Sequence, residues 1–189
     1  MAREIEIEFK NLLTKVEYDK LTTYLPLQSS THFRQINHYF ETSDFSLKNK
    51  GAALRIREKE SGYVLTLKQP HPDGLLETHD KLSEEEAMRW LNNQPFETEF
   101  VGKQLKECNI SIEKLRYGGA LITDRTELVY HNTLVVLDHS SYNGKEDYEL
   151  ELEATNWELG NQVFQEILEA CSIAKRAPIS KIQRFYDTL

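Results

Sequence analysis

Three segments of this sequence alternate charged and apolar residues, a fourth strand-like segment ends in a lysine, and two of the four are acidic. Residues 4–10 read Glu-Ile-Glu-Ile-Glu-Phe-Lys, and residues 148–153 read Tyr-Glu-Leu-Glu-Leu-Glu. A period of two is typical of a β-strand and places the charged side chains of a segment on one face. Closely spaced carboxylates suit a hard divalent cation such as Mg²⁺, which prefers oxygen ligands. The candidate metal ligands are therefore Glu6, Glu8, Asp138, Glu151 and Glu153.

The other two segments are basic. Residues 54–59 read Leu-Arg-Ile-Arg-Glu-Lys, and residues 63–68 end in a lysine. Guanidinium groups bind phosphate oxygens through pairs of parallel hydrogen bonds. Cations, a metal ion and a confined polyphosphate together suit phosphoryl transfer by positioning and electrostatic stabilisation, with water as the attacking group. The candidate contacts to an anionic ligand are Lys10, Arg55, Arg57, Lys68 and Arg125.

The 4–10 segment taken alone favours an ordinary strand whose charged face lies in water. The return of the pattern in two acidic and two basic strands is what favours one polar working surface. Dry burial of about ten charges would cost several kcal/mol for each unpaired ion. A barrel with these charged faces turned inward must therefore contain water in its interior, or must hold a metal ion and a charged ligand.

The periodicity and the turn residues predict an α+β protein. We expect strands over 4–10, 33–42, 52–60, 63–69, 75–82, 112–117, 120–130, 133–139 and 147–155, and helices over 15–25, 83–91, 100–108, 156–170 and 180–189. The prolines and the glycine of residues 70–74, which interrupt regular secondary structure, predict a loop there. Eight or nine strands with short connections predict a closed or nearly closed antiparallel β-barrel with helices packed outside. A barrel of eight strands has room for side chains or one small ligand.

Length and charge narrow the class of protein. The chain has 189 residues and a net charge of -8, so we expect a single domain over 1–189 and no nucleic-acid partner. The first residues lack an apolar signal region, and no run of 18 apolar residues occurs, so we expect a cytoplasmic protein without a membrane anchor. Cys108 and Cys171 have no metal-binding spacing and are expected to be reduced thiols. The oligomeric state is left open, with a homodimer as one candidate.

The motif Glu6-x-Glu8-x-Lys10 resembles the ExExK signature of the CYTH proteins, the triphosphate tunnel metalloenzymes. That superfamily includes class IV adenylyl cyclases, thiamine triphosphatases and inorganic triphosphatases. The resemblance continues, in the family's order, through Tyr39-Phe40-Glu41-Thr42, Ala53-Leu54-Arg55-Ile56-Arg57, Leu65-Thr66-Leu67-Lys68, Asp124-Arg125-Thr126-Glu127, Leu137-Asp138, Glu151-Leu152-Glu153 and Ser180-Lys181-Ile182-Gln183-Arg184. The ordered set covers nearly the whole chain and is far more specific than ExExK alone.

The resemblance implies an eight-stranded antiparallel tunnel and a role for each matching residue. Mg²⁺ or Mn²⁺ would be bound by Glu6, Glu8, Asp138, Glu151 and Glu153, and the ExExK residues Glu6, Glu8 and Lys10 would be catalytic. A triphosphate would be held by Lys10, Arg55, Arg57, Lys68, Arg125 and Lys181, with Arg184 as a further candidate. Lys181 lies on the C-terminal helix, which in the family can close one mouth of the tunnel. Ala53 stands where the mammalian thiamine triphosphatases have an aromatic residue, which counts against thiamine recognition.

Three functions remain open on the sequence. The first is metal-dependent hydrolysis of inorganic triphosphate or a nucleoside triphosphate. The second is a class IV-type adenylyl cyclase, in which the ribose 3′-hydroxyl attacks the α-phosphate and releases pyrophosphate. The third is a non-catalytic module that binds polyphosphate or a nucleotide. The concentrated carboxylates disfavour the third, because anion binding alone gains nothing from them.

Overall fold

Eight strands form a closed antiparallel β-barrel in the computed structural model, which describes residues 3–177 and 179–188. The strands are β1 (Arg3–Leu13), β2 (Thr31–Thr42), β3 (Ala53–Lys59), β4 (Gly62–His71), β5 (Gly74–Leu82), β6 (Leu115–Tyr130), β7 (Thr133–Tyr142) and β8 (Lys145–Ala154). Their order around the barrel is β1-β5-β4-β3-β2-β6-β7-β8. The expectation of a closed eight-stranded barrel in an α+β protein is confirmed.

Six α-helices accompany the strands in this described part of the chain. They are α1 (Lys15–Tyr24), α2 (Ser46–Asn49), α3 (Glu84–Leu91), α4 (Val101–Glu107), α5 (Trp157–Ala170) and α6 (Lys181–Tyr186). Capping boxes begin α1 at Thr14 and α3 at Ser83, because each cap pairs with a glutamate three residues later. Among the helices that the structure describes, none is both long enough and apolar enough to cross a membrane.

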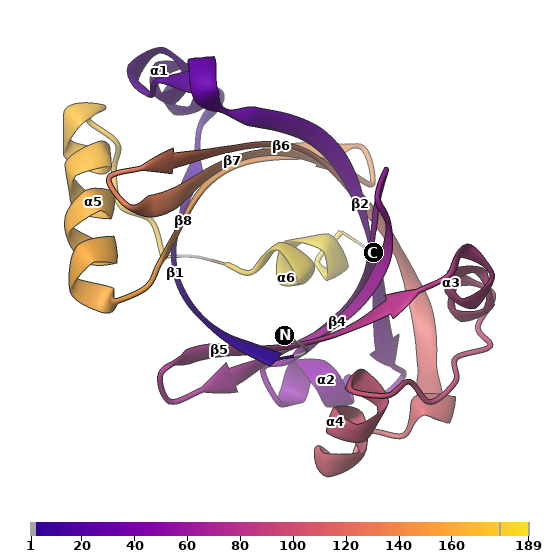
Figure 1. Ribbon diagram of the computed structural model, residues 1–189. Helices are drawn as coiled ribbons and strands as arrows, with labels where there is room; N and C mark the ends of the chain where they lie inside the picture. The colour runs from indigo at the N-terminus through magenta and orange to yellow at the C-terminus, as the bar shows by residue number, and fades with distance from the viewer. Residues whose placement is uncertain (1–2, 178, 189) are drawn as a thin grey trace. The chain divides into compact units, whose positions relative to one another are not determined.

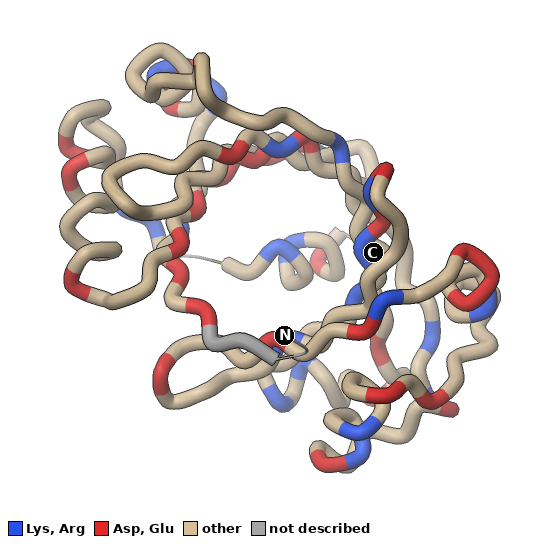
Figure 2. Tube along the Cα trace, viewed as in Figure 1, with Lys and Arg blue, Asp and Glu red and all other residues tan. Residues whose placement is uncertain are grey.

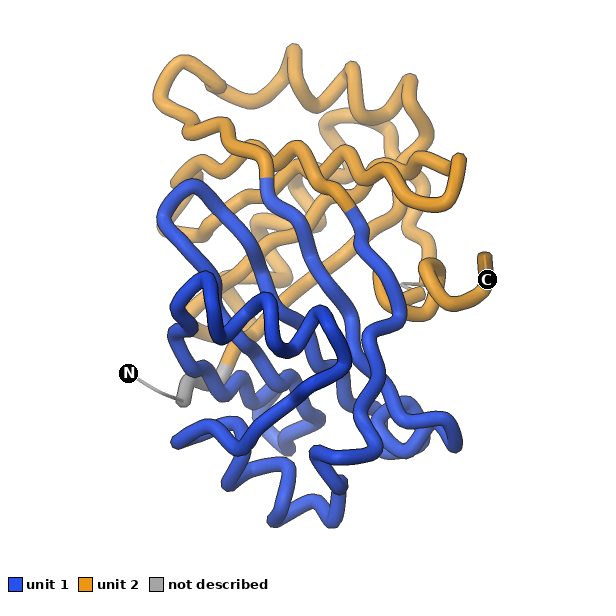
Figure 3. The backbone as a smooth tube through the Cα atoms, turned by 90° about the vertical axis from the view of Figure 1, so that its right-hand side faces the viewer, with its two compact units in different colours: residues 1–5, 35–121 blue, residues 6–34, 122–189 orange. Residues whose placement is uncertain are grey.

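The chain forms two compact units, coloured separately in Figure 3. Unit 1 comprises residues 1–5 and 35–121, and unit 2 comprises residues 6–34 and 122–189. Each unit has its own hydrophobic core. The expectation that residues 1–189 form a single domain stays a prediction.

Unit 1 is built on the antiparallel succession β2, β3, β4 and β5. Its core joins Leu54, Ile56, Leu65 and Leu67 of β3 and β4 to Trp90 of α3 and to residues of α4. Two buried carboxylates cap the N-termini of helices in this unit. Glu41 accepts hydrogen bonds from backbone N–H groups at the start of α2. Asp80 accepts hydrogen bonds from the backbone N–H groups of Phe100 and Val101 at the start of α4. These carboxylates are structural caps, which explains their burial.

Unit 2 pairs β1 with β8, β8 with β7, and β7 with β6. One face of these strands presents Val135, Leu137, Leu150 and Leu152 to the apolar side of α5. Gly160 allows the close approach of α5, because a Cβ there would clash with Phe9 and lie 2.8 Å from the Cβ of Ala154. In Figure 1, α5 covers this outer face and α6 lies on the opposite side of β7 and β8. The second face is therefore left to the charged residues.

Two local predictions are wrong. The separate strands expected over 112–117 and 120–130 are a single strand, β6, preceded by a 3₁₀ turn at Ile112–Lys114. Gly119, with a φ of 128°, lies inside this strand and does not end it. The loop expected over 70–74 is mostly hairpin. Pro70 pairs with Leu75, and His71 pairs with Gly74, so only residues 72 and 73 form the turn. Cys108 and Cys171 are free thiols, as expected.

Candidate active site

The acidic residues of β7 and β8 share a face with the charges of β1. The register places Glu8 opposite Glu153, and Lys10 opposite Glu151. On the other side of β8, Asp138 of β7 lies opposite Glu149. Strand alternation forces this arrangement, because the intervening leucines of β8 point toward α5. Figure 2 shows the run of acidic residues along β8 and β1.

Arg125 of β6 connects two of the candidate metal ligands. Its Nε donates to Oδ1 of Asp138 at 2.8 Å, and its Nη2 donates to Oδ2 of Asp138 at 2.7 Å and to Oε2 of Glu151 at 2.8 Å. The Asp138 side chain is fully buried, and that of Arg125 is 8% exposed. A planar guanidinium suits this bidentate geometry, so the three residues form a rigid buried ion-pair network.

Two lysines complete the network. Lys181, the first residue of α6, donates to Oδ2 of Asp138 and, at 3.3 Å, to Oε1 of Glu151. Lys10 lies 2.7 Å from Glu8 and 3.3 Å from Glu151. Burial alone would lower the pKa of the Lys181 ammonium, but Asp138 and Glu151 raise it above its usual value. Burial alone would raise the pKa of Asp138, and Lys181 and Arg125 lower it. Both groups are therefore charged at neutral pH.

Glu153 lies at the end of the cluster where carboxylates are most concentrated. Burial, followed by the neighbouring carboxylates of Glu6, Glu8 and Glu151, raises the pKa of Glu153 to about 8. Such mutual repulsion is what a bound cation would relieve, so the donor set fits a hard divalent metal. Within residues 3–177 and 179–188, no three acidic, imidazole or thiol groups already converge closely enough to hold a metal ion.

Glu149 belongs to the same cluster, although its place outside the family motifs kept it from the sequence-based set. Its side chain is 2% exposed and accepts a hydrogen bond from Nη2 of Arg184 at 2.7 Å. Burial, with a contribution from Glu151, raises the pKa of Glu149 to about 7. The signal for it was present, because Glu149 has the same strand phase as Glu151 and Glu153. Arg184, expected as a triphosphate contact, is ion-paired with Asp147 at 2.9 Å and with Glu149.

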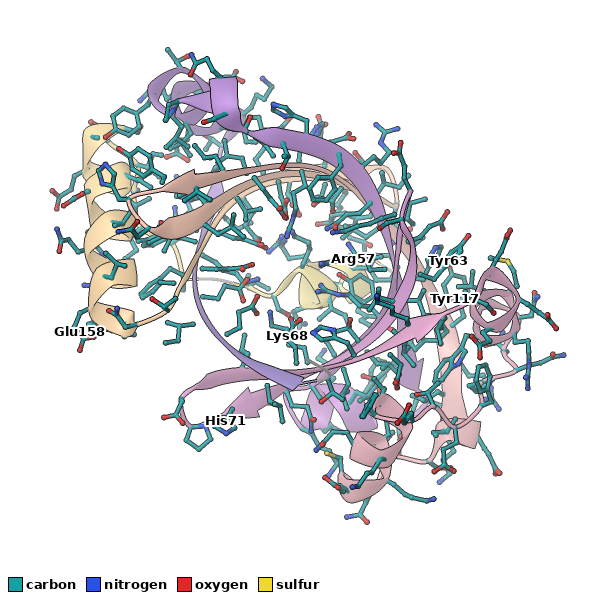
Figure 4. All side chains as sticks on the ribbon, viewed as in Figure 1. Arg57, Tyr63, Lys68, His71, Tyr117 and Glu158 are labelled. Atoms are coloured by element: carbon teal, nitrogen blue, oxygen red, sulfur yellow. The ribbon has the colours of Figure 1, made fainter. Side chains whose placement is uncertain are left out.

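The basic residues of unit 1 share a face of β3 and β4. Nζ of Lys68 lies 3.0 Å from Oε1 of Glu77, and Nη2 of Arg55 lies 3.9 Å from the same oxygen. Nε of Arg57 donates to Asn37 at 3.1 Å. Burial alone would raise the pKa of Glu77, but Arg55 and Lys68 lower it to about 2. In Figure 4, Arg57 and Lys68 project from the same side of the sheet.

Two further residues complete this basic face. Glu77 serves as the counter-ion that holds the two cations in place. Nε2 of His79 lies 3.5 Å from Oε2 of Glu77, and its Nδ1 lies 3.0 Å from Oγ1 of Thr66. Both follow from the pairing of β4 with β5, which places Lys68 opposite Glu77 and Thr66 opposite His79.

A closed barrel of eight antiparallel strands, with carboxylates on β1 and β8 and cations on β3 and β4, defines the triphosphate tunnel class of fold. The chain belongs to the CYTH family, since residues 4–186 match the CYTH domain.

Individual relatives resemble the chain over nearly its whole length. It is 46% identical to YjbK of Bacillus subtilis (strain 168), named as a candidate triphosphatase, over 99% of this chain and 97% of that protein. A crystal structure of a candidate adenylate cyclase from Bacillus halodurans is also 46% identical, with a TM-score of 0.94 over 98% of this chain and 100% of that one. A Hippeastrum protein, described as an adenylyl cyclase candidate with a dominant triphosphatase activity, shares the fold at 20% identity, with a TM-score of 0.80 over 97% and 96% of the two chains.

Proposed function

We propose that this protein hydrolyses a phosphoanhydride bond of a small triphosphate, either inorganic triphosphate or a nucleoside triphosphate. The observation that carries the proposal is the arrangement in unit 2. There, the carboxylates of Glu6, Glu8 and Glu153 stand beside cations that include the partly buried Lys10. A module that only bound anions would gain nothing from buried carboxylates that repel its ligand. The name of the Bacillus subtilis relative, a candidate triphosphatase at 46% identity, supports the same reading.

The metal in this proposal is Mg²⁺ or Mn²⁺. The residues that would hold it are Glu6, Glu8 and Glu153, joined by Asp138 and Glu151 as the resemblance implies. A bound divalent ion supplies Lewis-acid polarisation of a phosphoryl oxygen and lowers the pKa of coordinated water. The raised pKa of Glu153 supports this assignment, because the pKa reports negative charge that a cation would compensate.

The cations of the chain would bind and orient the triphosphate. In unit 2, Lys10, Arg125 and Lys181 are candidates for phosphate contacts, and Asp138 and Glu151 hold Arg125 and Lys181 in fixed positions. Fixed donors stabilise developing charge better than mobile ones, because they need no reorganisation during the reaction. In unit 1, the resemblance assigns phosphate contacts to Arg55, Arg57 and Lys68. Arg184 is a further candidate, and its guanidinium is ion-paired with Asp147 and Glu149.

The second candidate function is adenylyl cyclase activity of the class IV type. It is supported by the Bacillus halodurans structure, a candidate adenylate cyclase at 46% identity. The same phosphate-binding cations and the same metal would serve both reactions. The difference lies in the attacking group, water in one case and the ribose 3′-hydroxyl in the other.

Product analysis tests the proposal and separates these reactions. The purified protein is incubated with Mg²⁺ or Mn²⁺ and, in separate reactions, inorganic triphosphate, ATP and thiamine triphosphate. The proposal predicts orthophosphate and pyrophosphate from inorganic triphosphate, or ADP and orthophosphate from ATP. Cyclic AMP and pyrophosphate from ATP would favour the cyclase. Protection against thermal unfolding by triphosphate, without any turnover, would replace the proposal with a binding role.

A further inference from the structure

A second polar cluster in unit 2 lies outside the charged face and fastens the segment that leads to α6. Asn11 of β1 is fully buried. Its Nδ2 donates to the carbonyl of Ala174 at 3.0 Å, and its Oδ1 accepts from the backbone N–H of Arg176 at 2.6 Å. A buried amide that satisfies the backbone of a distant segment through both of its polar atoms fixes the position of that segment.

The side chain of Arg176 adds a second set of contacts. Its Nη1 and Nη2 donate to Oε2 and Oε1 of Glu17 at 2.8 and 3.0 Å, and Nη1 also donates to the carbonyl of Leu12 at 2.9 Å. Glu17 is 9% exposed and also accepts from the backbone N–H of Thr14 at 2.8 Å as part of the α1 capping box. The guanidinium therefore joins the end of β1, the start of α1 and the segment after α5. We refer to this group of three residues as the clamp: Asn11, Glu17 and Arg176.

The clamp and the carboxylate cluster share β1. Asn11 directly follows Lys10, and neighbouring residues of a strand point to opposite faces. Lys10 contacts Glu8 and Glu151 on the charged face, while Asn11 holds residues 174–176 on the other. Lys181 comes five residues after Arg176 and reaches Asp138 and Glu151 from α6. In Figure 1, α5 lies outside the strands and α6 lies on their inner side.

We propose that Asn11, Glu17 and Arg176 are positioning residues that set where α6 lies, and hence where the Lys181 ammonium meets Asp138 and Glu151. The inference rests on the proposed function for its effect on triphosphate. Arg184 holds the far end of α6 to Asp147 and Glu149, so α6 is fixed from both sides. Loss of the clamp frees the near end, where Lys181 begins the helix. The flexible lysine stem absorbs part of the shift, so the effect is a weakening of triphosphate binding and not its loss.

The test compares Arg176→Ala with Arg34→Ala in the full chain. Arg34 is the matched control, because it also makes a bidentate pair in unit 2, with Asp124 at 2.7 and 2.9 Å, but in an exposed position. We expect Arg176→Ala to raise KM for inorganic triphosphate about tenfold with kcat within about threefold, the size of one weakened charged contact. Arg176→Lys, which keeps the positive charge but loses the bidentate fork, should recover part of the loss. Arg34→Ala should leave KM unchanged.

A double variant shows whether the effect passes through Lys181. If it does, Arg176→Ala adds no further rise in KM when Lys181→Ala is already present. A rise of the same factor in both backgrounds would overturn the proposal. Should Arg176→Ala fail to fold, Glu17→Gln replaces it, because the amide oxygen still accepts from Thr14 while the charge that holds Arg176 is gone.

Hydrogen exchange gives a readout that needs no activity. The amides of Arg184 and Asp187 donate to Ser180 and Gln183 within α6. These amides should exchange faster in Arg176→Ala than in Arg34→Ala. Equal exchange in α6, together with equal KM, would show that the clamp is purely structural. If the wild-type protein cleaves no triphosphate, the proposed function fails, while the exchange rates still decide whether the clamp positions α6.

Discussion

Replacement of Asp138 by alanine tests how the buried cations are held. Asp138 is fully buried and accepts two hydrogen bonds from Arg125 and one from Lys181. Alanine removes the carboxylate and leaves both cations in a site where Arg125 is 8% exposed and Lys181 is 11% exposed. The protein must then either keep two partly uncompensated charges buried or open the site to water.

The size of the effect follows from burial. Removal of one partner of a buried ion pair costs about 3–5 kcal/mol. Glu151 remains 2.8 Å from Arg125 and 3.3 Å from Lys181, so we expect the lower end, about 3 kcal/mol. For a chain of this length, 1 kcal/mol shifts Tm by about 2–4 °C, so the expected fall in Tm is about 6–12 °C.

Urea denaturation of the metal-free protein, followed by circular dichroism, measures this loss. The matched control is Asp124→Ala, which removes the acid of the exposed pair with Arg34, whose side chains are 49% and 66% exposed. Exposed pairs contribute about 0.2–1 kcal/mol, so the control should unfold close to wild type. Equal midpoints for the two variants would refute the reasoning, because the buried carboxylate would then be no more important than the exposed one.

Three other outcomes follow from the same geometry. Because Arg55 and Lys68 lower the pKa of Glu77 to about 2, against 4.5 ordinarily, the unfolded chain binds the extra proton between these values. The stability from Glu77 is thus present above pH 4.5 and lost as pH falls toward 2. The free energies of unfolding of wild type and Glu77→Gln, measured by urea denaturation, should therefore differ by about 3 kcal/mol at pH 7 and converge near pH 2, whereas a constant difference would contradict the pairing. Arg57→Ala should weaken triphosphate binding by about 1.5–3 kcal/mol in calorimetry, and an unchanged Kd would remove Arg57 from the site. Chelation of divalent ions should stop turnover and added Mn²⁺ should restore it, so activity that persists in chelator would count against the metal.

The strand faces could be predicted from the sequence because side chains alternate with a period of two. That rule placed Glu6, Glu8 and Lys10 on one face, and it correctly grouped Arg55 with Arg57. It could not assign partners, because register between distant strands depends on the packing of both faces. The period alone does not distinguish Glu149 from Glu151, because both share one face of the strand, and the structure places both in the cluster.

Contacts made by irregular segments could not be predicted, because such segments leave no periodic pattern of apolar and charged residues in the sequence. Arg176 lies 159 residues from Glu17 in sequence, in a segment without strand or helix pattern. Arg184 carried a motif match, which suggested a phosphate contact, yet the structure pairs it with Asp147. The loop predicted from the prolines and glycine of 70–74 was wrong because a hairpin can include such residues near its turn. Pro70 belongs to β4, and the pairing of β4 with β5 extends to His71.

The phosphorus NMR spectrum of inorganic triphosphate, recorded with Mg²⁺ and enzyme, tests the central claim most directly. It should be recorded for wild type, Glu8→Gln and Glu158→Gln. The last is a charge-matched control, because Glu158 is exposed at the start of α5 and points away from the strands in Figure 4. The account predicts signals of orthophosphate and pyrophosphate with wild type and Glu158→Gln, and an unchanged triphosphate spectrum with a folded Glu8→Gln. Equal cleavage by Glu8→Gln and wild type would contradict it.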